Sequence, residues 1–430
     1  MKRILLYIIV TASAMLFWTW ITFQATVGGW YHRPITDQHT SQAFQKAADV
    51  EIDKQFTGNF AMAVMNNGKI EFEKFHSAGS PVNSNTVFQV ASLSKWVSAF
   101  GIMKLVENGQ LDLDAPVSTY LTRWKLPPSE FNNEGVTVRR LLSHTAGLTD
   151  GLGYSGFEKG TPVQPIEQSL TKALDADEGV SGAVRVGIEP GSEFKYSGGG
   201  YTLLQLIVEE VSGQTFADYM KQNIFQPLHM NHSTYTWSDS SSLELAEFYN
   251  SNGTKAPHFR YTSLAATSLY TSLSDLETFF QVFLVGKSNE PIGRNVLKPE
   301  TIKMMRSPHA QTMGEDIWGL GTMLLVPTEN DDFIIGHDGK STPPINTAVR
   351  LNPNTGDGII VLETGSPLLA TKLASEWVFW KTGKVDTLLF TMGADRMITI
   401  IGIGWGAIVL FFIGLLIKKN TNFLNLHGST

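Results

Sequence analysis

Two long stretches without a charged residue, one near each end of the chain, constrain this sequence most. Ile4–Phe23 is 20 residues long and follows Lys2-Arg3, and Met397–Ile417 is 21 residues long and precedes Lys418-Lys419. About 20 apolar residues in a helix cross a hydrocarbon core of about 30 Å. The sequence therefore predicts a transmembrane helix at each end, within residues 1–29 and 395–420, and one domain between them, residues 30–390.

The positions of the basic residues predict the orientation of both helices. Lys and Arg flank the outer end of each apolar stretch, so the positive-inside rule predicts that both termini are cytoplasmic. The intervening domain is then periplasmic or extracellular. A cleaved signal peptide is the alternative for the first stretch, but its apolar region is long and carries Phe17, Trp18, Trp20 and Phe23. We favour an uncleaved anchor.

Composition excludes several classes of function. The 430-residue chain has a net charge of −7 and no basic block, which argues against nucleic acid as a partner. It has no cysteine, which excludes disulfides, thiolate metal sites and a cysteine nucleophile. His229 and His232 have a spacing that can hold a metal, but no third ligand is evident, so we predict no metal and no other cofactor.

The most informative stretch inside the domain begins at Phe88. Apolar residues recur at helical spacing from Leu93 to Met103, which predicts a helix with a buried face, and Ser92 stands at its start. Lys95 lies one turn later on the same side. A serine hydroxyl is a weak nucleophile until an adjacent base takes its proton, so this pair is typical of nucleophilic catalysis. A helix-cap role for Ser92 is the structural alternative.

The same Ser-x-x-Lys spacing occurs twice more, so the motif alone does not decide. Ser169-Leu-Thr-Lys172 lies in a polar stretch, and Ser192-Glu-Phe-Lys195 follows a Pro-Gly turn. Neither of these begins a buried helix. We therefore favour Ser92 and Lys95.

The order of the predicted elements indicates an α+β fold. A β-hairpin is predicted around Asn66-Asn67-Gly68, and four short strands follow late in the chain, within 319–326, 332–336, 346–351 and 358–362. Helices are predicted at 43–56, 201–211, 216–224 and 367–380. We expect one antiparallel sheet built from N- and C-terminal strands, with a mostly helical lobe supplied by the middle of the chain.

Two further motifs stand downstream of Ser92 and Lys95: Tyr196-Ser-Gly198 and His337-Asp-Gly339. Tyr154-Ser-Gly156 has the same spelling as the first, but only Tyr196 leads into an apolar helix. A lone histidine at a strand end is usually structural. The combination of all three motifs is far more specific than any one of them.

With these motifs and the segment Leu141-Leu-Ser-His-Thr-Ala-Gly-Leu148, the chain resembles the class C-type branch of the serine β-lactamase and penicillin-binding protein superfamily from about Ala43 to Trp380. The resemblance implies that Ser92 is the nucleophile and that Lys95 helps to take its proton. It implies that Tyr196 acts as or shares the base, and that His337, Asp338 and Gly339 line the acyl-enzyme pocket. The oxyanion hole would be the backbone N–H groups of Ser92 and Lys340.

Three departures from the family pattern bear on substrate choice. Gly198 stands where many relatives have an asparagine that contacts the substrate amide. Asp338 replaces a hydroxyl residue, and its negative charge is expected to disfavour a substrate carboxylate. Lys340 follows Gly339 where relatives have a Gly-rich turn, and it can restore a positive charge. These changes argue against an efficient β-lactamase.

The function predicted from the sequence is a membrane-anchored serine hydrolase that acts through a Ser92 acyl-enzyme on amide or ester bonds. The resemblance suggests cell-wall peptides containing D-amino acids as substrates. The alternatives are a carboxylesterase of the same fold, or a non-catalytic penicillin-binding-like domain that senses or scaffolds. The sequence does not indicate an oligomeric state.

Overall fold

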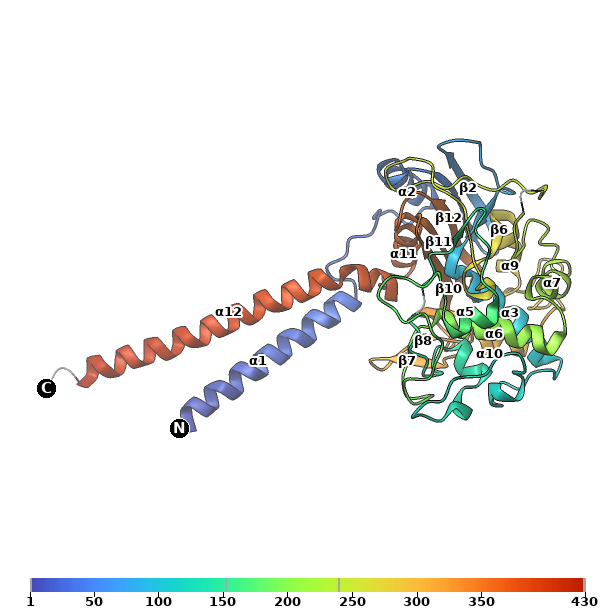
Figure 1. Ribbon diagram of the computed structural model, residues 1–430. Helices are drawn as coiled ribbons and strands as arrows, with labels where there is room; N and C mark the ends of the chain where they lie inside the picture. The colour runs from blue at the N-terminus through green and yellow to red at the C-terminus, as the bar shows by residue number, and fades with distance from the viewer. Residues whose placement is uncertain (1, 152, 239, 428–430) are drawn as a thin grey trace. The chain divides into compact units, whose positions relative to one another are not determined.

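The computed structural model describes residues 2–151, 153–238 and 240–427, and these form two compact units. Residues 41–374 form one unit, here called the sheet unit, and the two ends, residues 1–40 and 375–430, form the other, here called the helical unit. Two long helices, Lys2–Val27 (α1) and Thr387–His427 (α12), dominate the helical unit (Figure 1). Each contains a stretch apolar enough to span a membrane, Leu5–Val27 and Asp395–Ile417, each of 23 residues.

Helices α1 and α12 contact each other in antiparallel orientation. Trp18 Nε1 donates to the carbonyl of Ile400 at 3.2 Å, and Trp405 Nε1 donates to Thr19 Oγ1 at 3.0 Å. Farther along the pair, Tyr7 and Phe412 make an edge contact with ring centroids 6.5 Å apart. Interhelical hydrogen bonds of this kind stabilise helix pairs in an apolar medium by about 0.6 to 2 kcal/mol each.

On α12, Gly404 lies against α1, whereas Gly402, Gly406 and Gly414 face open space. A Cβ added to Gly404 would lie 1.9 Å from Trp18 Nε1, whereas one added to Gly402 or Gly406 would meet no atom within 4 Å. The Gly402-x-x-x-Gly406 pattern is therefore not the face that contacts α1. The close approach depends on Gly404, which lies between them.

Within the described residues, the sheet unit contains an eight-stranded antiparallel sheet in the order β2-β1-β12-β11-β10-β9-β8-β7. Its strands are Asn59–Asn66 (β1), Lys69–Ser77 (β2), Ala310–Thr312 (β7), Glu315–Trp318 (β8), Met323–Pro327 (β9), Phe333–Ser341 (β10), Ile345–Asn352 (β11) and Asp357–Thr364 (β12). The N-terminal β1 pairs with the C-terminal β12, with Asn59 opposite Thr364. The predicted sheet of terminal strands is confirmed.

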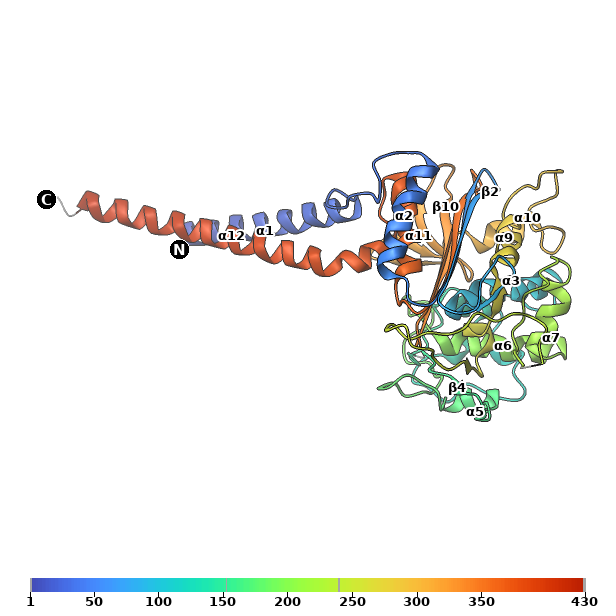
Figure 2. The same ribbon diagram turned by 90° about the horizontal axis from the view of Figure 1, so that it is seen from above.

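The middle of the chain supplies the helices and two short strand pairs. The pairs are Val87–Gln89 (β3) with Tyr270–Ser272 (β6), and Phe157–Glu158 (β4) with Phe259–Arg260 (β5). The helices are Ser94–Glu107 (α3), Val138–Leu142 (α4), Ile166–Thr171 (α5), Gly198–Ser212 (α6), Phe216–Met220 (α7), Leu264–Thr267 (α8), Leu273–Gln281 (α9) and Pro299–Met305 (α10). On the other face of the sheet lies Ser41–Gln55 (α2), as Figure 2 shows. Leu369–Thr382 (α11) begins in the sheet unit and ends in the helical unit.

Helix α3 lies at the centre of the core. Every residue from Ser94 to Met103 is buried, although the sequence pattern predicted only one buried face. Trp96 stacks on Phe283 with ring centroids 5.0 Å apart, and Phe279 makes edge contacts with Trp96 and Phe100. Burial of such side chains stabilises the fold by about 1.5–3 kcal/mol each. The helix is buried on all sides because the sheet and the other helices surround it.

The contact between α1 and α12 can be tested by a substitution at Gly404. Because the chain contains no cysteine, a Tyr7→Cys/Phe412→Cys pair is expected to be linked across the two helices by a short bifunctional maleimide. Gly404→Leu places a side chain on Trp18 and is expected to lower the yield of this cross-link strongly. The measurement is gel shift of the full chain after cross-linking in detergent. Gly402→Leu, which points into open space, is the control, and equal yields in the two variants would contradict the contact.

Candidate active site

Ser92 and Lys95 lie together at the entry to α3. Ser92 occupies a single 3₁₀ turn, Ala91–Leu93, just before the helix, and is partly exposed. Lys95 is buried, and its Nζ donates to Ser92 Oγ at 3.1 Å and to the carbonyl of Ala266 at 2.8 Å. The residue at the N-cap position of α3 is Leu93, so Ser92 is not the helix cap. The hydroxyl of Ser92 is thus in contact with the buried amine while the residue stays partly exposed.

The other two Ser-x-x-Lys sequences have different surroundings. Ser192 Oγ donates to the carbonyl of Glu189 in an exposed turn. Ser169 is buried in the short helix α5, while Lys172 is exposed. The structure therefore brings serine and lysine into contact at the predicted position, Ser92 and Lys95.

Tyr196 lies directly above the lysine. Its ring centroid is 5.1 Å from Lys95 Nζ, and 38% of the residue is exposed. Tyr154, the alternative in the sequence, is half-buried and its hydroxyl shares a hydrogen bond of 2.6 Å with Thr202 Oγ1. Burial raises the pKa of Tyr154 far above its usual value, which makes it a poor proton carrier. The geometry favours Tyr196.

The start of α6 holds Tyr196 in place from the C-terminal side. Ser197 is the N-cap and accepts the N–H of Gly200 at 2.8 Å. The carboxylate of Asp150, which is buried, accepts hydrogen bonds from Ser197 Oγ and from the N–H of Gly199. Gly198 is buried in the first turn of the helix. Asp150 was not among the predicted site residues, because nothing in the sequence indicates that it caps a helix nearly 50 residues later.

His337 projects from the face of β10 that carries the core residue Ile335. Its Nδ1 lies 2.7 Å from the carbonyl of Asp338; a carbonyl only accepts, so Nδ1 carries the proton. Burial and the nearby Lys95 lower the pKa of His337 to about 3, so the ring is neutral at pH 7. Nε2 is buried and has no hydrogen-bond partner among the described residues. This nitrogen is therefore an acceptor without a partner in the part of the chain that the structure describes.

Gly339 allows β10 to approach the serine turn. A Cβ at this position would lie 2.0 Å from the carbonyl oxygen of Val90, just before the turn that carries Ser92. Thr347 Oγ1 donates to the same carbonyl at 2.9 Å. A glycine is therefore required where the strand meets the turn.

Asp338 and Lys340 lie on the opposite face of the sheet from His337, because side chains alternate along a strand. The Asp338 carboxylate is paired with the buried Arg350 and accepts a hydrogen bond from Thr371 Oγ1 at 2.6 Å. The expectation that Asp338 repels a substrate carboxylate stays a prediction, and it is weakened because Arg350 balances the charge of Asp338. The alternation likewise places the Lys340 side chain away from His337.

Two residues outside the three motifs complete the site. The ring of His144 lies 4.3 Å from the ring of Tyr196 and 4.9 Å from that of Trp318. Trp318 also makes edge contacts with His337 and Tyr196. The sequence pointed to the segment around His144 only through the family resemblance. It contained no signal for Trp318, which reaches the site because β8 folds back next to β9.

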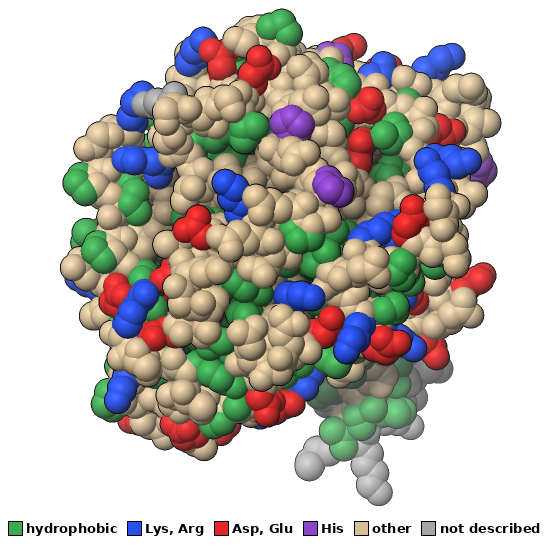
Figure 3. Space-filling model, turned by 90° about the vertical axis from the view of Figure 1, so that its right-hand side faces the viewer, with side chains coloured by type: hydrophobic (Ala, Val, Ile, Leu, Met, Phe, Trp, Pro, Cys, Tyr) green, Lys and Arg blue, Asp and Glu red, His purple; other side chains and the backbone are tan. Residues whose placement is uncertain are grey.

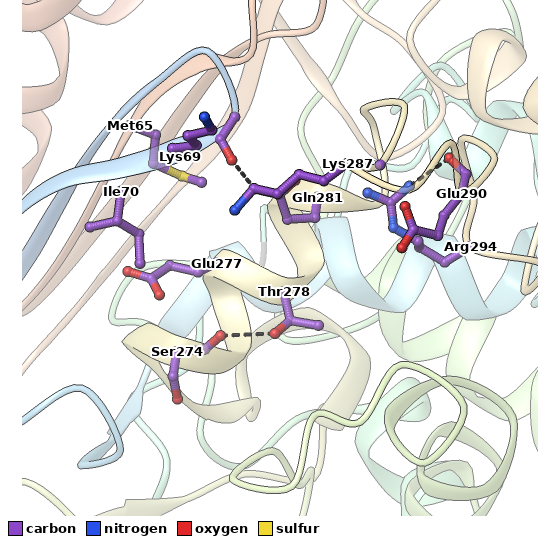
Figure 4. Close-up of a pocket in the computed structure, with 12 residues that line it drawn as sticks. Met65, Lys69, Ile70, Ser274, Glu277, Thr278, Gln281, Lys287, Glu290 and Arg294 are labelled. Carbon is purple, nitrogen blue, oxygen red and sulfur yellow. Dashed lines mark hydrogen bonds between the residues drawn. The ribbon is translucent and has the colours of Figure 1, made fainter.

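One groove with a titratable side chain lies away from these residues. Residues of β2 and α9, including Ile70 and Gln281, line a cavity of about 350 Å³ that contains none of the predicted site residues (Figure 4). Burial and the nearby Glu73 raise the pKa of Glu277 in this groove to about 7. On the face that Figure 3 shows, acidic and basic side chains are interspersed.

The two histidines that suggested a metal site do not converge. His232 Nδ1 lies 3.4 Å from Asp275 Oδ1, while His229 is exposed on the preceding turn. Among the described residues, no group of three His, Asp or Glu side chains is arranged to hold a metal ion. The absence of a cofactor remains a prediction.

Comparison with known proteins agrees with this geometry. The model of the Beta-lactamase family matches residues 44–375. The chain belongs to the Beta-lactamase family. Members of this family are generally serine hydrolases or penicillin-binding proteins, so the resemblance and the fold class predicted from the sequence are confirmed.

Individual members of the family show how far the likeness extends. Protein flp of Staphylococcus aureus strain N315 is 26% identical over 337 residues, which are 75% of this chain but 63% of that protein. Penicillin-binding protein 4* of Bacillus subtilis is 39% identical over 169 residues, 39% of this chain and 35% of that protein. The chain thus matches less than two thirds of each relative's length.

Solved structures of the family share the fold. The octameric penicillin-binding protein homologue from Pyrococcus abyssi is 26% identical with a TM-score of 0.64, covering 80% of this chain and 77% of that one. A penicillin-binding protein from Bacillus halodurans is 21% identical with a TM-score of 0.59, covering 77% of this chain and 98% of that one. The second likeness shows the fold alone.

The low pKa of His337 predicts an acid-sensitive fold. In the unfolded chain a histidine takes up a proton near pH 6.5, whereas His337 in the folded chain does so near pH 3, so stability falls as the pH drops below 6.5. Between pH 6.5 and pH 5 this group alone removes up to about 2 kcal/mol. The free energy of unfolding of His337→Gln is expected to fall less between pH 7 and pH 5 than that of the parent. The measurement is chemical denaturation at the two pH values. The exposed His229→Gln is the control, and an undiminished loss in His337→Gln would contradict the assignment.

Proposed function

We propose that this protein is a membrane-anchored serine hydrolase that forms an acyl-enzyme on Ser92. The observation that carries the proposal is the 3.1 Å hydrogen bond from the buried Lys95 Nζ to Ser92 Oγ, with Tyr196 and His337 beside it. A buried amine placed on a partly exposed hydroxyl is the arrangement that nucleophilic catalysis needs. Membership of the Beta-lactamase family supports the same chemistry.

In the proposed reaction Ser92 Oγ attacks the carbonyl carbon of an amide or ester. Its proton passes to Lys95 or Tyr196, which act as a pair, and then to the leaving amine or alcohol as the bond to the carbonyl carbon breaks. Water, deprotonated by the same pair, then attacks the ester on Ser92. Its hydroxyl forms the new acid, and the proton returns to Ser92.

Two backbone N–H groups, those of Ser92 and Lys340, are the proposed oxyanion hole. The argument is the close approach of Gly339 to the carbonyl of Val90, which holds the end of β10 beside the serine turn. Fixed donors of this kind are worth about 2.7–4 kcal/mol of transition-state stabilisation each. Within the described residues, β10 pairs with β9 only as far as Gly336, so residues 337–341 have one edge without a partner strand.

For His337 we propose a neutral acceptor role. Its protonated Nδ1 is bound to the Asp338 carbonyl, and its unpartnered Nε2 accepts a hydrogen bond from a substrate N–H. Because its pKa is about 3, the ring does not itself carry a proton through the reaction at neutral pH.

The proposed substrates are cell-wall peptides that contain D-amino acids. The paired charge of Asp338 weakens one argument against a substrate with a carboxylate. Gly198 still leaves the substrate amide without the asparagine contact of many relatives, which favours a peptidase of altered specificity over a β-lactamase. A carboxylesterase and a non-catalytic binding domain are the rival outcomes of the following test.

The nucleophile can be tested by intact-mass analysis of the full chain in detergent. A fluorophosphonate and, separately, a penicillin are expected to add one adduct each, and Ser92→Ala should lose both adducts. Ser192→Ala, which changes the serine of a rival motif, is the control and should label like the parent. Labelling by the fluorophosphonate alone would favour the esterase, and a folded parent without any adduct would refute the hydrolase.

We also propose that α1 is retained and that residues 30–390 lie outside the cytoplasm, between anchors at 1–29 and 395–420. In the sequence, Lys2-Arg3 precedes the first apolar stretch and Lys418-Lys419 follows the second. The hydrogen bonds from Trp18 to α12 and from Trp405 to α1 favour an α1 that stays in the mature protein.

The topology is testable because the chain has no cysteine of its own. Asn252→Cys, in an exposed turn of the sheet unit, is expected to react with a membrane-impermeant maleimide on intact cells or spheroplasts. A cysteine appended after Thr430 should react only after the cells are broken. Labelling of the appended cysteine on intact cells would overturn the proposed orientation.

A further inference from the structure

One residue outside the three motifs, His144, holds Tyr196 from three directions. The carbonyl of His144 accepts the N–H of Lys195 at 2.7 Å, and its Nδ1 accepts the N–H of Ser197 at 3.2 Å. The rings of His144 and Tyr196 are 4.3 Å apart and inclined by 33°. The backbone on each side of Tyr196 and the tyrosine ring itself are therefore all fixed by this single residue.

The ring of His144 has one orientation and one protonation state. It is buried, and Tyr201 and Trp318 lie against it at centroid distances of 5.3 and 4.9 Å. Burial, together with the nearby Lys95 and His337, lowers the pKa of His144 well below its usual value, so the ring is neutral. Since Nδ1 accepts a hydrogen bond from Ser197, the proton is on Nε2.

The backbone of His144 adopts a conformation that most residues avoid. Its φ is +57°, in the left-handed region, where a residue other than glycine or asparagine costs about 1 kcal/mol or more. This conformation directs both the carbonyl and the ring of His144 at the Lys195–Ser197 segment. The cost of this backbone conformation has to be offset by the contacts that His144 makes with residues 195–197.

Tyr196 depends on its contacts with His144 because its hydroxyl has no hydrogen bond that would hold the ring in place. The hydroxyl makes no hydrogen bond to the part of the chain that the structure describes, and the residue is 38% exposed. The position of the phenol above Lys95 is thus set by backbone contacts and by the rings beside it. We propose that His144 is the positioning residue for Tyr196, an inference that rests on the proposed role of Tyr196 as proton carrier.

The proposed role has a kinetic consequence. A misplaced phenol slows proton transfer, so kcat is expected to fall by about 10²-fold for His144→Leu, whereas KM changes little because His144 does not touch the substrate edge of β10. His144→Asn keeps an acceptor near the Nδ1 position and tolerates a positive φ, so its loss is expected to be smaller, about tenfold. A kcat that decreases in the order parent, His144→Asn, His144→Leu distinguishes positioning from general packing.

The matched control is His229→Asn. His229 also has a positive φ, +59°, but it is exposed and remote from the motifs. All variants are compared as full chains in detergent by fluorophosphonate acylation rate and hydrolysis of an aryl ester, with melting temperature as the check on folding. His229→Asn should behave like the parent.

A double substitution decides whether His144 acts through Tyr196. In a Tyr196→Phe background, His144→Asn is expected to cause no further loss of kcat, because residues that act as one unit are not additive. A full additional tenfold loss, or an unchanged kcat in a folded His144→Leu, would overturn the proposal.

A second measurement separates failure of this inference from failure of the proposed function. In the 3-fluorotyrosine-labelled protein, the ¹⁹F resonance of Tyr196, identified by its loss in Tyr196→Phe, should shift in His144→Asn but not in His229→Asn. If the parent shows no acylation at all, the proposed function fails, and this resonance alone tests the positioning. An unshifted resonance in His144→Asn would refute it.

Discussion

The hydrogen bonds of the Lys95 amine are the interaction on which the rest of the site depends. An amine buried in a core is costly unless every donor has a partner. Here Ser92 Oγ and the carbonyl of Ala266 accept two of its hydrogen bonds, and the ring faces of Tyr196 and Tyr201 lie within 5.6 Å. The same contacts that make burial of the lysine tolerable therefore also place it against the nucleophile and the tyrosine.

Burial of Lys95 requires that α3 be covered on both sides. Helix α3 has to be surrounded for Lys95 to be buried, yet Ser92 has to remain accessible at the end of that helix. The helices from the middle of the chain cover α3 on one side, and the sheet covers it on the other. The Ala91–Leu93 turn, in which Ser92 is partly exposed, lies where these helices meet the sheet, held by the approach of Gly339 to Val90.

The polar network behind β10 supports the strand that carries His337. Asp338 is paired with Arg350, and Thr371 donates to Asp338 while Asn346 binds Thr371 and the carbonyl of Gly339. A buried pair like this is weak evidence for added stability, but removal of one partner is strongly destabilising, by about 3–5 kcal/mol. Its direct effect is to fix one strand position, with His337 and Gly339 on the side of the serine.

The sequence by itself determined many of the helices and strands, the order of the motifs and the two apolar helices. Periodicity is local, so the hairpin at β1 and β2, the helix after Ser92 and the late strands were predictable from nearby residues. The pair Ser92 and Lys95 was predictable for the same reason, because both residues lie within one helical turn. Tyr196 and His337 were predictable only in combination with that pair, through the family resemblance.

Only the tertiary structure decided what surrounds each of these residues. Asp150, His144, Trp318 and Arg350 act over separations of tens of residues, and no local pattern reports such contacts. The sequence reasoning treated the charge of Asp338 as isolated, whereas folding placed Arg350 beside it. Local patterns are determined by neighbours in the chain, but the environment of a charge or a ring is determined by neighbours in space.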